Sequence, residues 1–351
     1  KCVMDVNKGL HKFFSELICR VKKNIPSRIK RTIDFYKRDF LFDIMVEKRL
    51  FLPVNDISNL SLDIPLSIMP KHELGAANVF YGIAQIIKSY AQVPERYSLK
   101  CTYTHMFYGR PWKSDFDSSL PICMVWGDAM RNAFMEYTTK PIFTVGPPIC
   151  YAQCLYSQKE IADEKKRLGK NALIFPAHST HYANTIYSPS FLLKKARWLK
   201  NDFDSIRFCI YWKDYILGNA KAFLESEFEC ITAGHIFDPL FLPRLKAIIS
   251  VADHTFGNAL GSHSGLSIGM NVPHSIFYQK LSHSGDIYYA KADEYVRELK
   301  KLSELFYEYS SVITAEQKKV VDNYWGFSNV KEPGELRQIF QFAEESYQKN
   351  N

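Results

Sequence analysis

Residues 247–278 have the sequence AIISVADHTFGNALGSHSGLSIGMNVPHSIFY, and the predicted fold depends on this stretch. Its apolar runs predict strands at residues 247–252 and 272–278, with a helix opening at residues 266–270 between them. The loop at residues 258–265 is small and polar, and its two glycines allow a ligand to approach the backbone closely. Because the free N–H groups of a helix N-terminus favour anions, this loop suits a phosphate. An ordinary loop with a serine as helix cap fits the same residues.

Strand and helix patterns alternate along the chain from Glu73 to residue 278. Such alternation predicts parallel sheets covered by helices, which is the α/β class. The remaining strands are expected at residues 99–105, 122–128, 141–146, 172–176, 207–212 and 228–233, and the helices at residues 75–91, 129–137, 158–168, 190–201, 215–224 and 239–247.

The chain has 351 residues, which is long enough for two domains. Its first part is rich in lysine, arginine and aromatic residues, and three prolines follow, so we expect a basic helical segment and then a linker. We divide the chain into this segment and linker at residues 1–70, two Rossmann-like halves at residues 71–157 and 158–291, and C-terminal helices at residues 292–351.

The composition is that of a folded protein, with 46% apolar and 15% aromatic residues. The eight cysteines form no CxxC pair and five lie in or beside apolar runs, which favours buried thiols in a reducing cytosol. No apolar run has the length of a membrane span. The net charge of +8 attracts anions, including nucleotide-sugars, acidic lipids and nucleic acids. We therefore expect a cytoplasmic protein whose basic residues 1–50 either pack on the body or lie peripherally on an anionic inner membrane.

In the second half, a polar cluster follows each predicted strand. Ligands of open α/β sheets bind at the carboxyl ends of the strands, so these clusters indicate a binding site. The candidate donor-binding residues are His178, Ser179, Thr180, Lys213, Gly234, His235, Ser262, His263, Ser264 and Gly265.

Several of these residues also have simpler roles open to them. His178 and His181 are three positions apart, which suits two metal-binding imidazoles, but no third ligand is evident nearby. The two hydroxyl residues between them suit a helix cap, and so does Asp238. His235 suits either a contact to a phosphate or a capping or packing position in the fold.

The first half offers two candidates for a general base, which must be a carboxylate or imidazole facing the second half. Asp128 ends the strand expected at residues 122–128 and is our first choice, although it also suits the N-cap of the next helix. His105 ends a neighbouring strand and is the second choice.

Several common motifs are absent from the sequence. There is no GxxxxGK[ST], no GxGxxG after the first strand and no GxSxG, which disfavours P-loop hydrolysis, nicotinamide or flavin binding, and α/β-hydrolase chemistry. No zinc-finger or RNA-recognition signature is visible either. We therefore expect no cofactor and no nucleic-acid partner.

Five short segments resemble bacterial surface-polysaccharide glycosyltransferases, the enzymes that build capsule or lipopolysaccharide chains. They are VWGD at residues 125–128, FTVGPPICYA at 143–152, IFPAHST at 174–180, ITAGHIFDPLFLPRLKAII at 231–249 and NALGSHSGLSIGMNVP at 258–273. The resemblance covers about residues 73–290. It implies the GT-B fold, in which two Rossmann-like parallel-sheet domains face a cleft.

The resemblance also implies a nucleotide-sugar donor held by the C-terminal half and a glycan or lipid-linked acceptor on the N-terminal half. Sialyl- and Kdo-transferases, which use CMP-sugars, pair a first-half acid with a second-half histidine and with hydroxyl residues at a helix start. Asp128, His235, Ser262 and Ser264 would fill these places. Their histidine is usually followed by proline, whereas Ile236 follows here, so UDP- and GDP-sugars stay open.

Under this interpretation, Asp128 or His105 removes the proton of the acceptor, while His235 and the loop at residues 262–265 stabilise the departing phosphate. A retaining reaction with Asp128 as nucleophile is also compatible. We expect no metal, because the acidic pair in Asp115-Phe-Asp117 lies in a serine-rich loop away from the polar clusters of the second half.

Three other functions are compatible with the sequence. A sugar-nucleotide epimerase or a polyol-phosphate transferase of the same fold would use the same phosphate loop. A non-catalytic nucleotide- or nucleic-acid-binding protein belongs to a different class, and its basic N-terminus would make nucleic-acid binding strongly salt-dependent.

Overall fold

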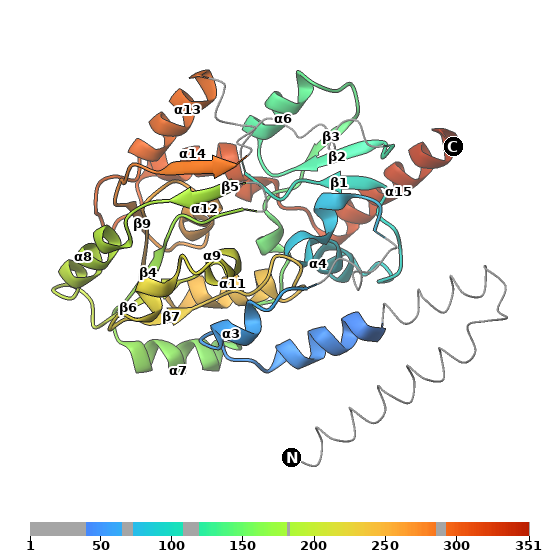
Figure 1. Ribbon diagram of the computed structural model, residues 1–351. Coiled ribbons are helices and arrows are strands. Elements are labelled where there is room, and N and C mark those ends of the chain that lie inside the picture. Colours follow the sequence, from blue (N-terminus) through green and yellow to red (C-terminus); the bar gives the residue numbers. More distant parts are fainter. Residues whose placement is uncertain (1–39, 65–72, 108–118, 181–182, 286–292, 351) are drawn as a thin grey trace, which may run out of the picture. The chain divides into compact units, whose positions relative to one another are not determined.

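The computed structural model describes residues 40–64, 73–107, 119–180, 183–285 and 293–350 (Figure 1). The chain divides into two compact units, one made of Lys1–Met45 and Pro65–Lys71, the other of Val46–Ile64 and His72–Asn351. All the sheets and helices named below belong to the second unit.

The first half of this unit contains a parallel sheet with the strand order β1-β2-β3. The strands β1 and β2 are buried at every position, which accounts for the unbroken apolar sequence ICMV of β2. The elements are η2 (Ala76–Gly82), α4 (Ile83–Tyr90), β1 (Cys101–Tyr103), β2 (Ile122–Val125), α6 (Asp128–Met135), β3 (Ile142–Thr144) and η3 (Pro148–Cys150).

The second half contains a larger parallel sheet with the order β7-β6-β4-β8-β9. The two parallel sheets with their helices confirm the predicted α/β class. The elements are α7 (Gln158–Leu168), β4 (Asn171–Phe175), α8 (Pro189–Leu199), β6 (Ser205–Cys209), α9 (Trp212–Ile216), α10 (Lys221–Leu224), β7 (Glu229–Ile231), α11 (Phe241–Val251), β8 (His254–Gly257), α12 (Ser262–Gly269) and β9 (His274–Ile276).

One predicted strand is wrong. Residues 247–252 belong to the end of α11 and its C-cap, and the strand that pairs with β4 is β8. Nearly every side chain of α11 is buried, so the helix is apolar on most of its faces. A short apolar run in a buried helix has no periodicity that distinguishes it from a buried strand.

A small antiparallel pair was not predicted. The strands β5 (Ala183–Ile186) and β10 (Ser282–Gly285) pair with each other outside the parallel sheets. Their sequences, ANTI and SHSG, are short and half polar, so neither gives a clear period-2 pattern.

The C-terminal part is helical, as predicted, with α13 (Asp293–Glu304), α14 (Ala315–Trp325), η4 (Phe327–Asn329) and α15 (Pro333–Asn350). The helix α15 lies beside the first sheet (Figure 1). The Arg337 guanidinium donates to Ala91 O at 2.9 Å, and Tyr97 donates its hydroxyl hydrogen to Glu344 Oε2 at the same distance. The end of the chain therefore packs on its first half.

Residues 46–64, which include the start of the predicted linker, do not form an exposed linker. They pack on the second half of the unit. They contain the short helix α3 (Ile57–Leu60), and Leu60 and Ile64 are almost fully buried. The backbone of Val54 accepts a hydrogen bond from Thr232 N–H at 2.8 Å, just after β7. This segment thus lines the β7 edge of the second sheet.

Most of the cysteines expected to be buried are buried. Cys101, Cys123 and Cys209 are buried free thiols, while Cys150 and Cys230 are half-buried, and burial raises the pKa of Cys209 to about 12. None of the helices in the described part combines the length and apolar character needed to cross a bilayer.

Candidate functional site

The second sheet has a topological switch point between β4 and β8. In the order β7-β6-β4-β8-β9, the chain goes from β4 to β6 on one side and later returns to β8 on the other. Ligands of open α/β sheets bind where the loops after two such strands separate. Here Ala177 N–H donates to Asn258 Oδ1 at 2.6 Å, which joins the two loops at their start. The ligand position expected from topology therefore lies over these loops.

His178 and Thr180 are exposed on the loop after β4. The centroid of the His178 ring lies 4.1 Å from that of Tyr211, and its Nδ1 lies 3.1 Å from Ser179 O. Thr180 Oγ1 accepts a hydrogen bond from Ala183 N–H at 3.1 Å. Both side chains stand at the switch point, as the sequence predicts.

Ser179 and Lys213 are placed differently. Ser179 is buried, its N–H donates to the Asp214 carboxylate at 3.0 Å, and its Oγ accepts from Thr185 N–H at 3.1 Å. Lys213 is half-buried, with Nζ 5.5 Å from the centroid of the Trp212 ring. The Ser179 hydroxyl therefore holds its loop against β5, and we withdraw the donor contact predicted for it.

The predicted phosphate loop starts α12, as expected. Gly261 is the N-cap, Ser262 is the first helical residue, and the buried Ser264 Oγ accepts a hydrogen bond from Gly261 N–H at 3.3 Å. The Ser264 hydroxyl thus stabilises the helix start, while Ser262, in the first turn, is half-buried. The N-terminus of α12 stands beside the end of β8, where the topology places an anion.

Gly265 is a glycine because of Trp325. Trp325 is fully buried, donates its Nε1–H to Ser262 O at 2.9 Å, and stacks on Phe107 with ring centroids 3.8 Å apart. A Cβ at Gly265 would lie 2.1 Å from Trp325 Cδ2, so even alanine requires the tryptophan to move. In the sequence, this glycine indicates a place where a ligand approaches the backbone closely. In the structure, the missing Cβ makes room for a core side chain, so a β-branched residue here would disturb the fold.

We therefore expect Gly265→Ala to lower the free energy of unfolding by about 1–3 kcal/mol or more, the usual result of overpacking a core. Gly334→Ala is the matched control, since a Cβ there would meet only Arg337 Nη2 at 3.9 Å. Urea denaturation of both variants measures the difference. Equal midpoints for the two variants would show that Trp325 yields without cost.

The His263 side chain is packed among rings of the second sheet. Its ring stacks on Phe175 with centroids 4.7 Å apart and meets the His274 ring edge-to-face at 5.3 Å. Burial, reinforced by the charge of His178, lowers the pKa of His263 to about 3, so the ring is neutral at pH 7. A neutral imidazole packed beneath the loop gives little attraction to an anion, and we assign the predicted contact at this position to the backbone only.

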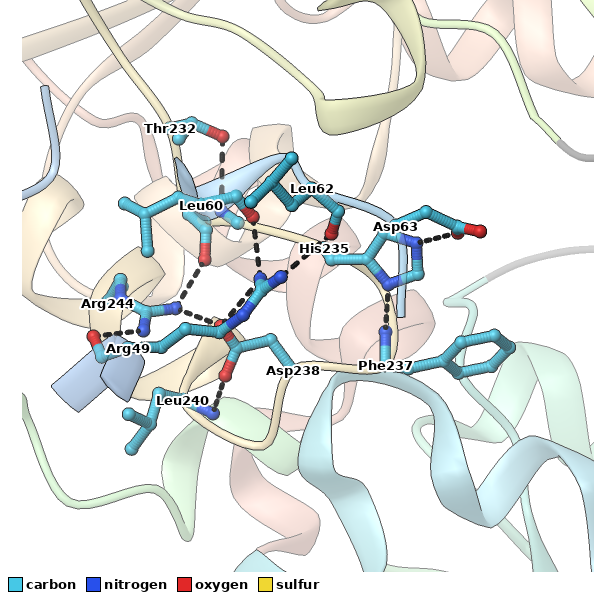
Figure 2. A network of polar contacts seen from close by, with 12 residues as sticks. Arg49, Leu60, Leu62, Asp63, Thr232, His235, Phe237, Asp238, Leu240 and Arg244 are labelled. Carbon is cyan, nitrogen blue, oxygen red and sulfur yellow. Dashed lines mark hydrogen bonds and ion pairs between the residues drawn. The ribbon is translucent and has the colours of Figure 1, made fainter. Parts of the chain in front are cut away.

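His235 is buried after β7, and both of its ring nitrogens have partners (Figure 2). Nδ1 accepts a hydrogen bond from Phe237 N–H at 3.2 Å, and Nε2 lies 3.2 Å from Asp63 Oδ1. The Trp212 ring covers the imidazole, with centroids 3.8 Å apart. A direct contact between His235 and a donor phosphate, as the sequence predicts, would therefore require Asp63 to move away.

Asp238 is not merely a helix cap. Its carboxylate lies between two buried guanidinium groups, with Oδ2 2.7 Å from Arg244 Nη1 and 3.6 Å from Arg49 Nη1 (Figure 2). We refer to Arg49, Asp238 and Arg244 as the charge cluster. Gly234 has φ +100°, and a Cβ there would lie 3.0 Å from Arg244 Nη1. Backbone conformation and the charge cluster thus account for this glycine, in place of the predicted donor contact.

An aromatic cluster joins the two halves of the unit. From the first half, the Tyr81 hydroxyl lies 3.4 Å from the Tyr211 hydroxyl, and Phe80 stacks on Phe237 with centroids 5.8 Å apart. Tyr81 has φ 57°, an uncommon backbone conformation for a residue other than glycine, and its N–H donates to Ile236 O. An unfavourable backbone conformation of this kind persists only when the surrounding contacts enforce it, and such residues are often found at functional sites.

His105 belongs to this aromatic cluster. It follows β1, is half-buried, and its ring lies 4.8 Å from Phe80 between centroids. Burial lowers the pKa of His105 to about 4, so at pH 7 the imidazole is neutral and able to accept a proton. His105 contacts Phe80 and Tyr81. These two residues in turn contact Phe237 and Tyr211, which follow strands of the second sheet.

Asp128 lies elsewhere. It is the exposed first residue of α6, where Gly127 is the N-cap and no side-chain capping hydrogen bond forms. The helix α6 packs mainly on β3 and α14. The contacts therefore favour His105 over Asp128, which reverses the order suggested by the sequence.

Among the residues that the structure describes, no group of three or more histidine, cysteine, aspartate or glutamate side chains could hold a metal ion. His181 and the pair Asp115 and Asp117 lie outside those residues.

Sequence reasoning missed Asp63, Tyr211 and the charge cluster. Asp63 and Arg49 lie in segments that we assigned to a linker and a solvated helix, and Tyr211 sits inside an apolar strand. One signal was available at Arg244, which interrupts the apolar run FLPRLKAII. A buried arginine is almost always paired, so a partner carboxylate could have been sought near it in the sequence.

The comparisons with known proteins give distant similarities. No protein-family model matches the chain. No curated protein matches it significantly. Among solved structures, the wall teichoic acid polymerase TagF is similar over 89% of this chain and 98% of its own, with a TM-score of 0.38 and 9% identity. An S. aureus MnaA–UDP co-structure is similar over 72% of this chain and 67% of its own, with a TM-score of 0.34 and 12% identity. At these scores the similarity assigns neither a substrate nor a reaction to this chain.

Proposed function

We propose that the protein is a glycosyltransferase with a GT-B arrangement, which moves a sugar from a nucleotide-sugar donor to a bacterial surface glycan or lipid-linked glycan. One observation carries the proposal. His178, at the switch point of the second sheet, contacts Tyr211, which in turn contacts Tyr81 of the first half beside His105. A donor bound at the switch point would thus present its sugar to groups of the first half, where an acceptor would bind.

The donor phosphate is proposed to lie over the N-terminus of α12. Its free N–H groups, the helix dipole and the Ser262 hydroxyl would stabilise the negative charge that develops as the bond from the anomeric carbon to the phosphate oxygen breaks. His178 on the opposite loop is the second proposed contact. Because these groups supply the positive potential themselves, the proposal includes no metal ion.

The acceptor hydroxyl is proposed to lose its proton to His105 or Asp128, as its oxygen attacks the anomeric carbon. The contacts described above favour His105. Among donors, a CMP-sugar remains our first proposal, with UDP- and GDP-sugars as alternatives. The basic N-terminal segment is proposed to bring the enzyme to an anionic membrane face.

A thermal-shift screen against CMP, CDP, UDP and GDP tests the proposal. A ligand that binds only the folded state stabilises it by about 2.7 kcal/mol when present at 100 times its Kd, so the matching nucleotide is expected to raise Tm. A donor carrying that nucleotide should then transfer its sugar at the same rate with or without EDTA. No shift with any of the four nucleotides would contradict the function. Loss of transfer in EDTA and recovery with Mn²⁺ would contradict only the metal-independent part, and an epimerised donor without transfer would indicate an epimerase.

A further inference from the structure

Asp63 places an exposed carboxylate beside the carboxyl end of β7. Its side chain is 74% exposed, whereas His235, whose Nε2 lies 3.2 Å from Asp63 Oδ1, is 0% exposed. Figure 2 shows the Asp63 carboxylate beside the His235 ring, with a dashed line marking the contact. Of this pair, only the carboxylate is accessible to a ligand.

The protonation of His235 follows from its hydrogen bonds. Nδ1 accepts from Phe237 N–H, so the neutral ring carries its proton on Nε2, the nitrogen that lies 3.2 Å from Asp63 Oδ1. Because Trp212 covers the ring, the imidazole is held in one orientation. One oxygen of the Asp63 carboxylate therefore lies beside the held imidazole, and the remaining acceptor positions are left toward solvent.

The charge cluster fixes the backbone on both sides of this pair. Arg49 donates to the carbonyl oxygens of Leu60 at 2.9 Å and Leu62 at 2.8 Å, immediately before Asp63. Arg244 donates to Ala233 O at 3.2 Å, two residues before His235. Arg49 and Arg244 thus hold the backbone next to both Asp63 and His235 and so set the distance between them. Binding sites are commonly held in place by such supporting contacts.

The position of the pair relative to the switch point limits what it can bind. In the sheet, β7 is two strands from β4 and three from β8, and neighbouring strands lie about 4.8 Å apart, so the pair stands about 10 Å from the loop after β4 and about 14 Å from the start of α12 beside β8. At these distances, Asp63 and His235 are too far away to react at the carbon that is linked to the phosphate. Their position suits a contact to the nucleoside part of a nucleotide, which would extend from the phosphate along the strand ends. An ionised carboxylate only accepts hydrogen bonds, which matches the neighbouring hydroxyls of a ribose.

We propose that Asp63, oriented by His235, binds the ribose hydroxyls of the donor nucleotide. This inference rests on the proposed function, since it requires a nucleotide at the switch point. It makes the segment at residues 46–64 part of the binding site and gives His235 a positioning role. The ligand class is a ribonucleotide, and a 2′-deoxyribonucleotide is expected to bind less well.

The test compares the binding of CMP and UDP with that of dCMP and dUDP by calorimetry, using the nucleotide that the parental protein prefers. A hydrogen bond to a charged group contributes about 1.5–3 kcal/mol, so the parental protein is expected to prefer the ribonucleotide about tenfold or more. Asp63→Asn should bind the ribonucleotide about tenfold more weakly and lose most of this preference. His235→Gln should show a smaller loss of the same preference. Asp163→Asn, an exposed change of the same charge on α7, is the control and should bind as the parent does.

The outcomes separate the two proposals. If the parental protein binds no nucleotide, the proposed function and this inference both fail. If it binds nucleotides and Asp63→Asn keeps the parental affinity and ribose preference, the inference alone is overturned. Thermal unfolding checks that each variant is folded. We expect Asp63→Asn to be folded, because the Asp63 side chain is exposed.

Discussion

Asp238→Asn is expected to lower the free energy of unfolding by about 3–5 kcal/mol, the usual cost of removing one partner from a buried ion pair. Asparagine keeps the shape of the side chain and can still accept from Leu240 N–H, as Asp238 Oδ1 does at 2.9 Å. It removes the negative charge between Arg244 and Arg49, whose side chains are 0% and 6% exposed. Burial already lowers the pKa of Arg49, and the Asp238 carboxylate is the group that opposes this effect. Urea denaturation measures the effect.

Two controls test whether the loss of stability comes from the buried charge. Glu227→Gln removes the carboxylate that pairs with Arg197 at 2.9 Å on the surface, and its denaturation midpoint should stay near that of the parent. Replacing Arg49, Asp238 and Arg244 together by Met, Leu and Met should recover much of the loss, because apolar residues of similar volume often substitute for buried ion clusters. If Asp238→Asn unfolds at the same urea concentration as the parent, the Asp238 carboxylate is not needed to stabilise the two buried arginines.

His105→Gln is expected to reduce sugar transfer by about 10²–10⁴-fold, the typical effect of removing a general base, with little change in nucleotide affinity. The reason is that His105 joins the aromatic cluster that links the halves, while Asp128 is exposed at the start of α6. The measurement uses the donor found in the nucleotide screen and compares kcat with the Kd of the nucleotide. Asp128→Asn serves as the comparison and should keep the rate within a few-fold.

The pH dependence gives a second, independent readout of the same prediction. Burial lowers the pKa of His105 to about 4, so the imidazole is unprotonated at neutral pH and gains a proton only as the pH falls through about 4. The acidic limb of kcat/KM should therefore lie near pH 4 rather than near 6.5, and His105→Gln should lack it. If Asp128→Asn loses the rate instead, Asp128 is the base and His105 is a packing residue.

The periodicity of apolar residues in the sequence was sufficient to predict most of the helices and strands. The strand ends and the helices between them were predicted within a few residues, because α7 and α8 have polar faces and β2 and β4 are short apolar runs bounded by turn residues. The prediction failed at α11, where burial on nearly all sides removes the polar face that identifies a helix. It also shortened α12, whose first turn, SHSG, has no apolar residue.

The sequence placed several candidate residues on the right loops, but it did not show which way their side chains turn. His178 is exposed on the loop after β4, and Ser262 is the first residue of α12 after β8. Ser179, His263 and Gly265 turn inward to hydrogen bonds or rings that come from distant parts of the chain. Such partners have no signature in the local sequence. Asp63 was missed for the same reason, since its partner His235 is far along the chain.

The packing of Trp325 has a consequence for how the protein is made. The start of α12 is finished only when Trp325 fills the space over Gly265 and binds Ser262 O, and the same side chain stacks on Phe107 of the first half. A ribosome releases the loop at residues 261–265 long before it releases α14. The residues of both sheets therefore leave the ribosome before Trp325 does, and a truncated product that ends before α14 would lack the side chain that packs over Gly265 and Phe107. Apolar surface left uncovered in this way is what chaperones and proteases recognise.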